Sequence, residues 1–374
     1  MADAAPMLFV PVGDNPAEPF GMGARERACR LASEAGFKCA EEVQPGSPHL
    51  LANMAYAWDP IWLELLAKRP KTVLSLGGKP VLASVPADED AKAAASAIAD
   101  GEAISGYEEL AAEAATADFA PREIPFVLPL DPGHPEPVER AAYDAAYLAA
   151  YEGAADALTL YLWRRPAFFL TRWAARLHLS PNLVTGLGAA FCVLAFTLFW
   201  SGRYWLGILF GFSFMILDIV DGKLARCTGA SSKLGKVVDK GIDLIHPPFW
   251  WWAWLHGLYA YGRPLAPFHA TMVLWIILGG YAGERIIEAT SMKRFDGMDV
   301  HLWRPLDSKF RLVGAASSPN LLILFASLLF RRPDMGLEMV AWWTLISLIF
   351  HGVRLAQMTE LKARGGKVRS WLRP

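Results

Sequence analysis

This sequence of 374 residues has few cysteines and almost no net charge. Its four cysteines have no metal-ligand spacing, and their spread does not suggest a disulfide framework: Cys29, Cys39, Cys192 and Cys227. We therefore expect reduced thiols and a reducing compartment. The formal net charge of −1 excludes a strongly basic nucleic-acid-binding protein, and a hydrophobic content of 54% excludes a disordered chain.

The small net charge is the sum of two opposite parts. Residues 1–150 hold 11 Lys and Arg against 23 Asp and Glu, a net of −12. Residues 151–374 hold 25 against 14, a net of +11, together with 13 of the 15 Trp. This division predicts two modules in two different solvents.

The first module, residues 1–120, alternates β-like runs with helical stretches. We expect strands at 8–12, 37–43, 72–76 and 80–85 and helices at 23–36, 59–69 and 88–100. This order predicts an α/β fold with a mostly parallel sheet. The N-terminus lacks a basic stretch followed by a long apolar run, so we expect no secretory signal and a cytoplasmic module. Six prolines at 121–150 predict a linker and the start of a helix.

The loop between the first strand and helix resembles the opening of a sugar-phosphate nucleotidyltransferase, in which a Gly-rich loop cradles a nucleotide triphosphate. Gly13, Gly21 and Gly23 are present, but the compact Gly-x-Gly-Thr-Arg pattern is not. The later strands offer no convincing metal-binding Asp. The resemblance therefore favours a degenerate relative with a regulatory or scaffolding role.

The second module, residues 151–374, predicts an α-helical membrane domain. Six apolar runs approach the roughly twenty residues that cross a bilayer, at 183–201, 204–221, 237–259, 267–289, 315–330 and 336–354. The basic, aromatic stretch at 163–179 suits a helix in the membrane interface, and Trp250 to Trp252 suit interfacial anchors. Most Lys and Arg lie on the flanks that share a side with the segment before the first run, and few lie on the opposite flanks. This asymmetry predicts cytoplasmic N- and C-termini.

Four aspartates stand at the ends of two of these apolar runs. Asp218 and Asp221 are three residues apart, and Asp239 and Asp243 are four apart, so each pair shares a helix face. Ionisable groups within a membrane segment are costly and indicate function. If the chain turns back between the pairs, four carboxylates converge, and oxygen ligands of this kind suit Mg²⁺ or Mn²⁺.

The same stretch resembles the signature of the CDP-alcohol phosphotransferase family, D-x2-D-G-x2-A-R-x8-G-x3-D-x3-D. Its eight fixed positions are all present: Asp218, Asp221, Gly222, Ala225, Arg226, Gly235, Asp239 and Asp243. The resemblance covers about residues 160–360 and includes the segment SPNLVT, with Asn182 and Thr185, before the first apolar run.

This resemblance implies an activity and a set of roles. The four aspartates would hold two divalent ions, and Asp243 would act as general base. The CDP group would be bound by Asn182, Thr185, Gly222, Ala225, Arg226 and Gly235. The reaction would transfer a substituted phosphate from a CDP-alcohol, usually CDP-diacylglycerol in bacteria, to an acceptor hydroxyl, releasing CMP. It also implies a bacterial-type inner membrane, a cytoplasmic active site and a homodimer.

The acceptor stays open at this point. Lys233, Lys236 and Arg285 are candidates for binding a phosphorylated acceptor, although Arg285 could equally form a structural pair with Glu284 or Glu288. His246 could line the pocket but is more typical of helix packing. Two alternatives remain: a bifunctional cytidylyltransferase and CDP-polyol phosphotransferase, and a transporter or inactive scaffold whose aspartates bind cations.

Overall fold

The protein divides into two compact units. The computed structural model describes residues 6–115, 119, 125–151 and 155–372. The first unit, called the N-terminal unit, comprises residues 1–150, 168–181 and 222–232. The second, called the helical unit, comprises residues 151–167, 182–221 and 233–374.

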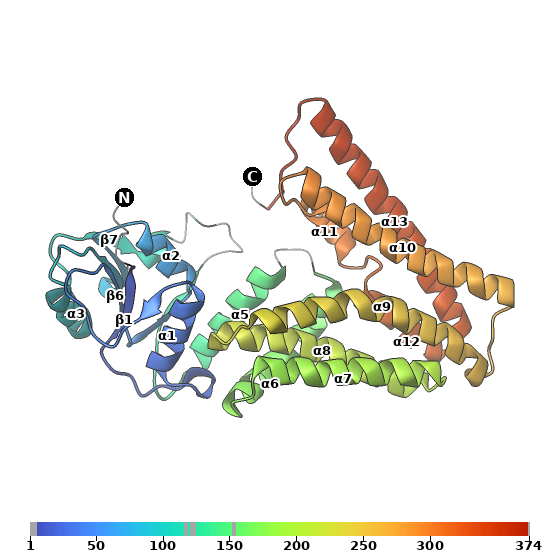
Figure 1. The fold of residues 1–374 in the computed structure, drawn as a ribbon, viewed down its shortest axis with the longest axis horizontal. Helices are drawn as coiled ribbons and strands as arrows, with labels where there is room; N and C mark the ends of the chain where they lie inside the picture. The colour runs from blue at the N-terminus through green and yellow to red at the C-terminus, as the bar shows by residue number, and fades with distance from the viewer. Residues whose placement is uncertain (1–5, 116–118, 120–124, 152–154, 373–374) are drawn as a thin grey trace. The chain divides into compact units, whose positions relative to one another are not determined.

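A mixed sheet forms the centre of the N-terminal unit (Figure 1). Its order is β2-β1-β3-β6-β5-β7, with bounds Lys38–Cys39, Leu8–Val12, His49–Asn53, Lys79–Val85, Thr72–Leu76 and Glu108–Ala111. Three of the five strand pairs are parallel, and β6 runs antiparallel to both of its neighbours. The expected α/β region is confirmed, and the strands predicted at 8–12, 72–76 and 80–85 form with nearly the predicted bounds.

Helices cover both faces of this sheet. Successive strand residues point to opposite faces, so Phe9 packs with α1 (Ala24–Glu34) and α2 (Ile61–Ala67). Its neighbour Val10 packs on the other side with α3 (Ala91–Asp100). The strands are therefore apolar on both faces, as in other covered sheets.

The expectation of reduced cysteines is wrong for one pair. Cys29 of α1 and Cys39 of β2 form a disulfide, with their Cα atoms 5.4 Å apart. The chain turns back directly after α1, and β2 then lies beside that helix, which brings together two residues that are ten apart in sequence. Cys192 and Cys227 are buried free thiols.

The Pro-rich segment 121–150 holds ordered structure in its described part, residues 125–150. Strand β8 (Val127–Pro129) pairs antiparallel with β4 (Tyr56–Trp58), and α5 spans Glu136–Tyr151. The fully buried Glu139 of α5 accepts a hydrogen bond from the Phe20 amide at 2.8 Å and pairs with Arg172 of α6 (Arg164–Arg176). Short elements η1 (Pro19–Gly21) and α4 (Ala112–Ala115) complete this unit.

Long helices dominate the rest of the chain (Figure 1). They are α7 (Pro181–Trp200), α8 (Tyr204–Thr228), α9 (Lys233–Tyr261), α10 (Pro267–Arg294), α12 (Ser317–Leu329) and α13 (Pro333–Ala363). Shorter elements are η3 (Leu158–Trp163), η4 (Val300–Leu302) and α11 (Pro305–Arg311).

Four of the described helices, α7, α8, α10 and α13, are long and apolar enough to cross a membrane. The membrane character expected from the sequence is thus supported, but the count of six spans is not confirmed. The charged first turns of α9 lower its hydropathy. With 13 residues, α12 is only about 20 Å long at 1.5 Å per residue, shorter than a bilayer core.

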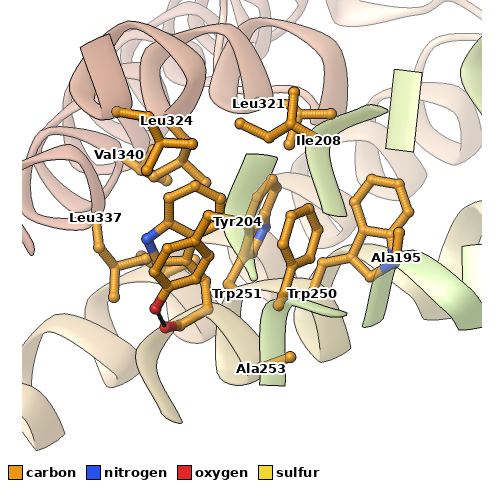
Figure 2. Close-up of a cluster of buried hydrophobic side chains, with 14 of the residues drawn as sticks. Ala195, Tyr204, Ile208, Trp250, Trp251, Ala253, Leu321, Leu324, Leu337 and Val340 are labelled. Carbon is orange, nitrogen blue, oxygen red and sulfur yellow. Dashed lines mark hydrogen bonds between the residues drawn. The ribbon is translucent and has the colours of Figure 1, made fainter. Parts of the chain in front are cut away.

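The core of the helical unit is rich in aromatic side chains (Figure 2). Trp250 and Trp251 of α9 are 0% and 2% exposed and pack with Tyr204 of α8 and Leu337 of α13. The interpretation of these two Trp as interfacial anchors is therefore wrong, because α9 turns this face toward its neighbouring helices. Trp252, on the opposite face, is 42% exposed.

Helices α10 and α13 approach each other closely. A Cβ atom added at Gly280 would lie 2.3 Å from Thr344 Cγ2, and one added at Gly283 would lie 2.7 Å from Leu348 Cδ1. Small residues at these positions of α10 allow side chains of α13 to pack directly against the α10 backbone.

Candidate active site

Three of the four predicted aspartates converge where α8 and α9 meet. Asp218 lies on α8, and Asp239 and Asp243 lie one turn apart on α9. One carboxylate oxygen from each can be chosen so that all three lie within 4.8 Å of one another. Asp218 and Asp239 are half-buried, and Asp243 is exposed. The short connection 229–232 reverses the chain and produces this convergence.

The fourth aspartate, Asp221 of α8, is hydrogen-bonded to a residue of α7. Its carboxylate is 5% exposed and accepts a hydrogen bond of 2.5 Å from the Thr185 hydroxyl of α7. Asp221 is not a member of the close group of three. The structure therefore connects Asp221 to α7, and it gives Thr185 a partner in the predicted metal-binding motif.

The electrostatics of the group of three favour a cation. Two unit charges 4.8 Å apart repel by about 3 kcal/mol at an effective dielectric constant of 20. Within the described parts of the chain, no Lys or Arg lies within 4 Å of these three carboxylates as an ion-pair partner. A set of carboxylate oxygens without basic partners fits Mg²⁺ or Mn²⁺.

The residues predicted to bind CDP follow this group along the same helices. Gly222, Ala225 and Arg226 lie in the last two turns of α8, and Gly235 lies in the first turn of α9. The nearest atom to a Cβ added at Gly222 is Arg226 Nη1, at 4.0 Å. Asn182 is exposed in the first turn of α7.

The acceptor candidates have different surroundings. Lys233 and Lys236 are exposed in the first turn of α9. Arg285 of α10 forms an ion pair of 2.6 Å with Glu288, the structural alternative considered from the sequence. One turn earlier on α10, the Tyr281 hydroxyl donates to the carbonyl of Leu244, the residue after Asp243. The Arg285 turn of α10 is thereby joined to the Asp243 turn of α9.

His246 packs within the helical unit. Its Nδ1 lies 2.9 Å from the Ile242 carbonyl, and its ring contacts Phe214 and Trp250 at centroid distances of 4.9 and 4.8 Å. These contacts support the packing role favoured by the sequence.

A buried polar network that the sequence did not predict joins α10, α13, η4 and α11. Glu284 accepts from His351 Nδ1 at 2.8 Å, and Arg354 forms a buried two-bond ion pair with Asp307. The ring of His301 lies edge-on to that of His351, with centroids 4.6 Å apart. The signal was available, because His351 and Arg354 are ionisable groups inside an apolar run.

The glycines of the loop in the N-terminal unit differ in their surroundings, since a Cβ added at Gly13 or Gly23 would meet no atom within 4 Å. A Cβ added at Gly21 would lie 3.0 Å from Arg176 Cα, so this glycine allows close packing against α6. Asn15 Nδ2 donates to the carbonyls of Met54 and Leu130 at 3.0 and 2.9 Å. The degenerate character of the loop stays a prediction, based on the missing Gly-x-Gly-Thr-Arg pattern.

Comparison with known proteins identifies the family of the helical part. Residues 178–349 match the family described as CDP-alcohol phosphatidyltransferase. This segment is a CDP-alcohol phosphatidyltransferase domain. It contains all eight signature residues and confirms the resemblance inferred from the sequence, whereas residues 1–177 lie outside the matched range.

The CDP-alcohol phosphatidyltransferase domain has curated relatives that share one name. The phosphatidylinositol phosphate synthase of Mycolicibacterium smegmatis is 32% identical over 105 residues, which cover 25% of this chain and 47% of that protein. The Mycobacterium bovis protein of the same name is 35% identical over 77 residues, covering 20% and 36%. The chain thus spans less than half the length of these relatives.

A solved structure also resembles the chain. The Mycobacterium tuberculosis phosphatidylinositol phosphate synthase with CDP-DAG bound has 20% sequence identity and a TM-score of 0.40, with 51% of this chain and 94% of that chain covered.

Proposed function

We propose that the protein transfers a phosphatidyl group from CDP-diacylglycerol to an acceptor hydroxyl, with release of CMP, in phospholipid synthesis. The observation that carries the proposal is the convergence of Asp218, Asp239 and Asp243 within the complete family signature. The four apolar helices support a membrane location, in which a lipid donor and a soluble acceptor would meet.

The aspartates have distinct tasks in the proposed reaction. Asp218, Asp221, Asp239 and Asp243 hold two divalent ions, Mg²⁺ or Mn²⁺, which supply charge neutralisation for the donor pyrophosphate when bound. The acceptor oxygen forms a new bond to the β-phosphorus, and the bond from that phosphorus to the bridging oxygen breaks, so that CMP leaves. Asp243, the most exposed of the three converging carboxylates, takes the proton of the acceptor hydroxyl.

The remaining signature residues position the donor. Gly222 leaves the α8 surface bare one turn before Arg226, so the backbone can be approached closely by the nucleotide. Arg226, with Asn182, Thr185, Ala225 and Gly235, binds the CDP group. Fixing the pyrophosphate relative to Asp243 makes the attack effectively intramolecular.

The proposed acceptor is a phosphorylated polyol, and inositol phosphate is the first to test, given the names of the relatives. Lys233, Lys236 and Arg285 offer positive charge on the two helices that meet near Asp243. A guanidinium that already pairs with Glu288 can bind a phosphate through its remaining N–H groups.

The proposed topology is a multi-pass protein of a bacterial-type inner membrane. The N- and C-termini and the active site face the cytoplasm, since the basic flanks gather on that side. Helix α9, about 44 Å long, can cross in addition to the four apolar helices, and the predicted run at 315–330 corresponds to α12, which is too short to cross the bilayer core on its own. The protein acts as a homodimer.

Substitution of Asp243 by Asn tests the role of this residue. Purified protein in detergent is given CDP-diacylglycerol, Mg²⁺ and inositol phosphate, and CMP release is measured. We expect Asp243→Asn to lose at least about a hundredfold in rate, in the range of general acid–base contributions. The exposed Glu360→Gln on α13 is the matched control. Unchanged turnover of Asp243→Asn would contradict its assignment.

The two alternatives predict other products. A bifunctional cytidylyltransferase would release pyrophosphate from CTP and a polyol phosphate, which the full chain can be assayed for directly. A cation transporter or scaffold would release no CMP with any acceptor and would show no metal-dependent stabilisation by CDP-diacylglycerol in a melting assay.

A further inference from the structure

Three residues of the proposed donor site lie close to the C-terminal end of α8. This helix ends at Thr228, only two residues after Arg226, and residues 229–232 connect it to α9. The last four carbonyls of a helix lack partners within the helix. The orientation of the turn that carries Gly222, Ala225 and Arg226 therefore depends on what holds these final residues.

Two polar side chains of α1 hold this end. Arg27 Nε donates a hydrogen bond of 3.0 Å to the Cys227 carbonyl, one residue after Arg226. Glu34 Oε1 accepts from the Ser231 amide at 2.7 Å and also from the Ser231 hydroxyl. Hydrogen bonds with a charged partner are the stronger class.

A close backbone approach lies between these two contacts. Gly229 has φ +63°, and a Cβ added there would lie 2.8 Å from the carbonyl carbon of Arg30 and 2.9 Å from the amide nitrogen of Leu31. Both are backbone atoms, so they cannot move aside as a flexible side chain would. Arg27, Arg30 and Glu34 lie on one face of α1 because they are spaced three and four residues apart.

The burial of Arg27 supports a positioning role. Its side chain is 6% exposed, and burial lowers the pKa of its guanidinium from the ordinary value, while Asp59 and Glu139 raise it. A buried charge is costly unless it is paired or hydrogen-bonded. The Arg27 Nε hydrogen bond goes to the end of α8 rather than to the sheet on which α1 packs.

We infer that α1 of the N-terminal unit is a positioning element for the donor-binding turn of α8, with Arg27, Glu34 and Gly229 as the positioning residues. The inference rests on the proposed function. It gives the α/β module a task that needs no nucleotide chemistry of its own: the module orients Arg226 and Gly222 for the CDP group.

Substitution at Glu34 tests the inference at an exposed position. Glu34→Ala removes the acceptor for Ser231, whereas Glu34→Gln retains an oxygen that can accept. We expect the KM for CDP-diacylglycerol to rise on the order of tenfold in Glu34→Ala, while its kcat stays within about twofold of the wild-type value. In Glu34→Gln we expect the KM to stay near the wild-type value. Arg30→Ala is the matched control, because its guanidinium pairs with Glu26 on the surface.

A second pair of variants and a second measurement keep the outcomes distinct. Arg27→Ala should raise the same KM, and hydrogen exchange at residues 225–232 should accelerate in Arg27→Ala and Glu34→Ala but not in Arg30→Ala. Unchanged KM and exchange in both variants, beside an active wild type, would overturn the inference alone. A wild-type protein that releases no CMP would refute the proposed function. Hydrogen exchange at residues 225–232 that is unchanged in both variants would then also refute the stabilisation of the α8 end by α1.

Discussion

Thr185 offers a direct test of how the helices organise the proposed metal site. Its hydroxyl donates to Asp221 at 2.5 Å, so Thr185→Val removes the donor while nearly conserving side-chain volume. A hydrogen bond to a charged group contributes about 1.5–3 kcal/mol. At about 1.4 kcal/mol per tenfold change, its loss corresponds to roughly a 10- to 100-fold weaker metal site.

The assay is CMP release as a function of Mg²⁺ concentration. We expect Thr185→Val to need roughly 10- to 100-fold more Mg²⁺ for half-maximal activity, and Thr185→Ser, which keeps the hydroxyl, to stay near wild type. Thr197→Val on the same helix is the control, since the Thr197 hydroxyl bonds only one turn back to the Leu194 carbonyl. An unchanged Mg²⁺ requirement in Thr185→Val would refute the reasoning.

Three further predictions concern stability, measured by unfolding in detergent. Gly280→Ala should lose about 1–3 kcal/mol because its Cβ would meet α13, whereas Gly279→Ala, with open space beside it, should be nearly neutral; equal losses would contradict the packing argument. Arg354→Met should cost about 3–5 kcal/mol by leaving a buried carboxylate unpaired, and a change no larger than that of the exposed Arg364→Met would contradict it. Cys29→Ser should cost about 3 kcal/mol for a loop of this length, and dithiothreitol should destabilise the wild type but not the variant.

The convergence of acidic side chains could be predicted because it follows from local features of the sequence. The spacing of Asp218, Asp221, Asp239 and Asp243 defines helix faces, and a short connection between two apolar helices allows those faces to meet. The apolar composition of α7, α8, α10 and α13 likewise predicts membrane character without knowledge of their packing.

Other features depend on neighbours that no local pattern identifies. Trp250 and Trp252 are two residues apart in similar surroundings, yet one is buried and the other exposed, because the direction of each side chain relative to the other helices decides burial. The disulfide at Cys29 required the turn after α1, and the partner of Glu284 proved to be His351, 67 residues away.

Residue type and short-range periodicity are enough to predict the family, the four acidic groups and the apolar helices. The hydrogen bond between Thr185 and Asp221, and those of Arg27 and Glu34 of α1 with the segment after Arg226, are evident only in the folded chain. These contacts join residues that are 36 to 200 positions apart in the chain, so they form only when the intervening segments have folded.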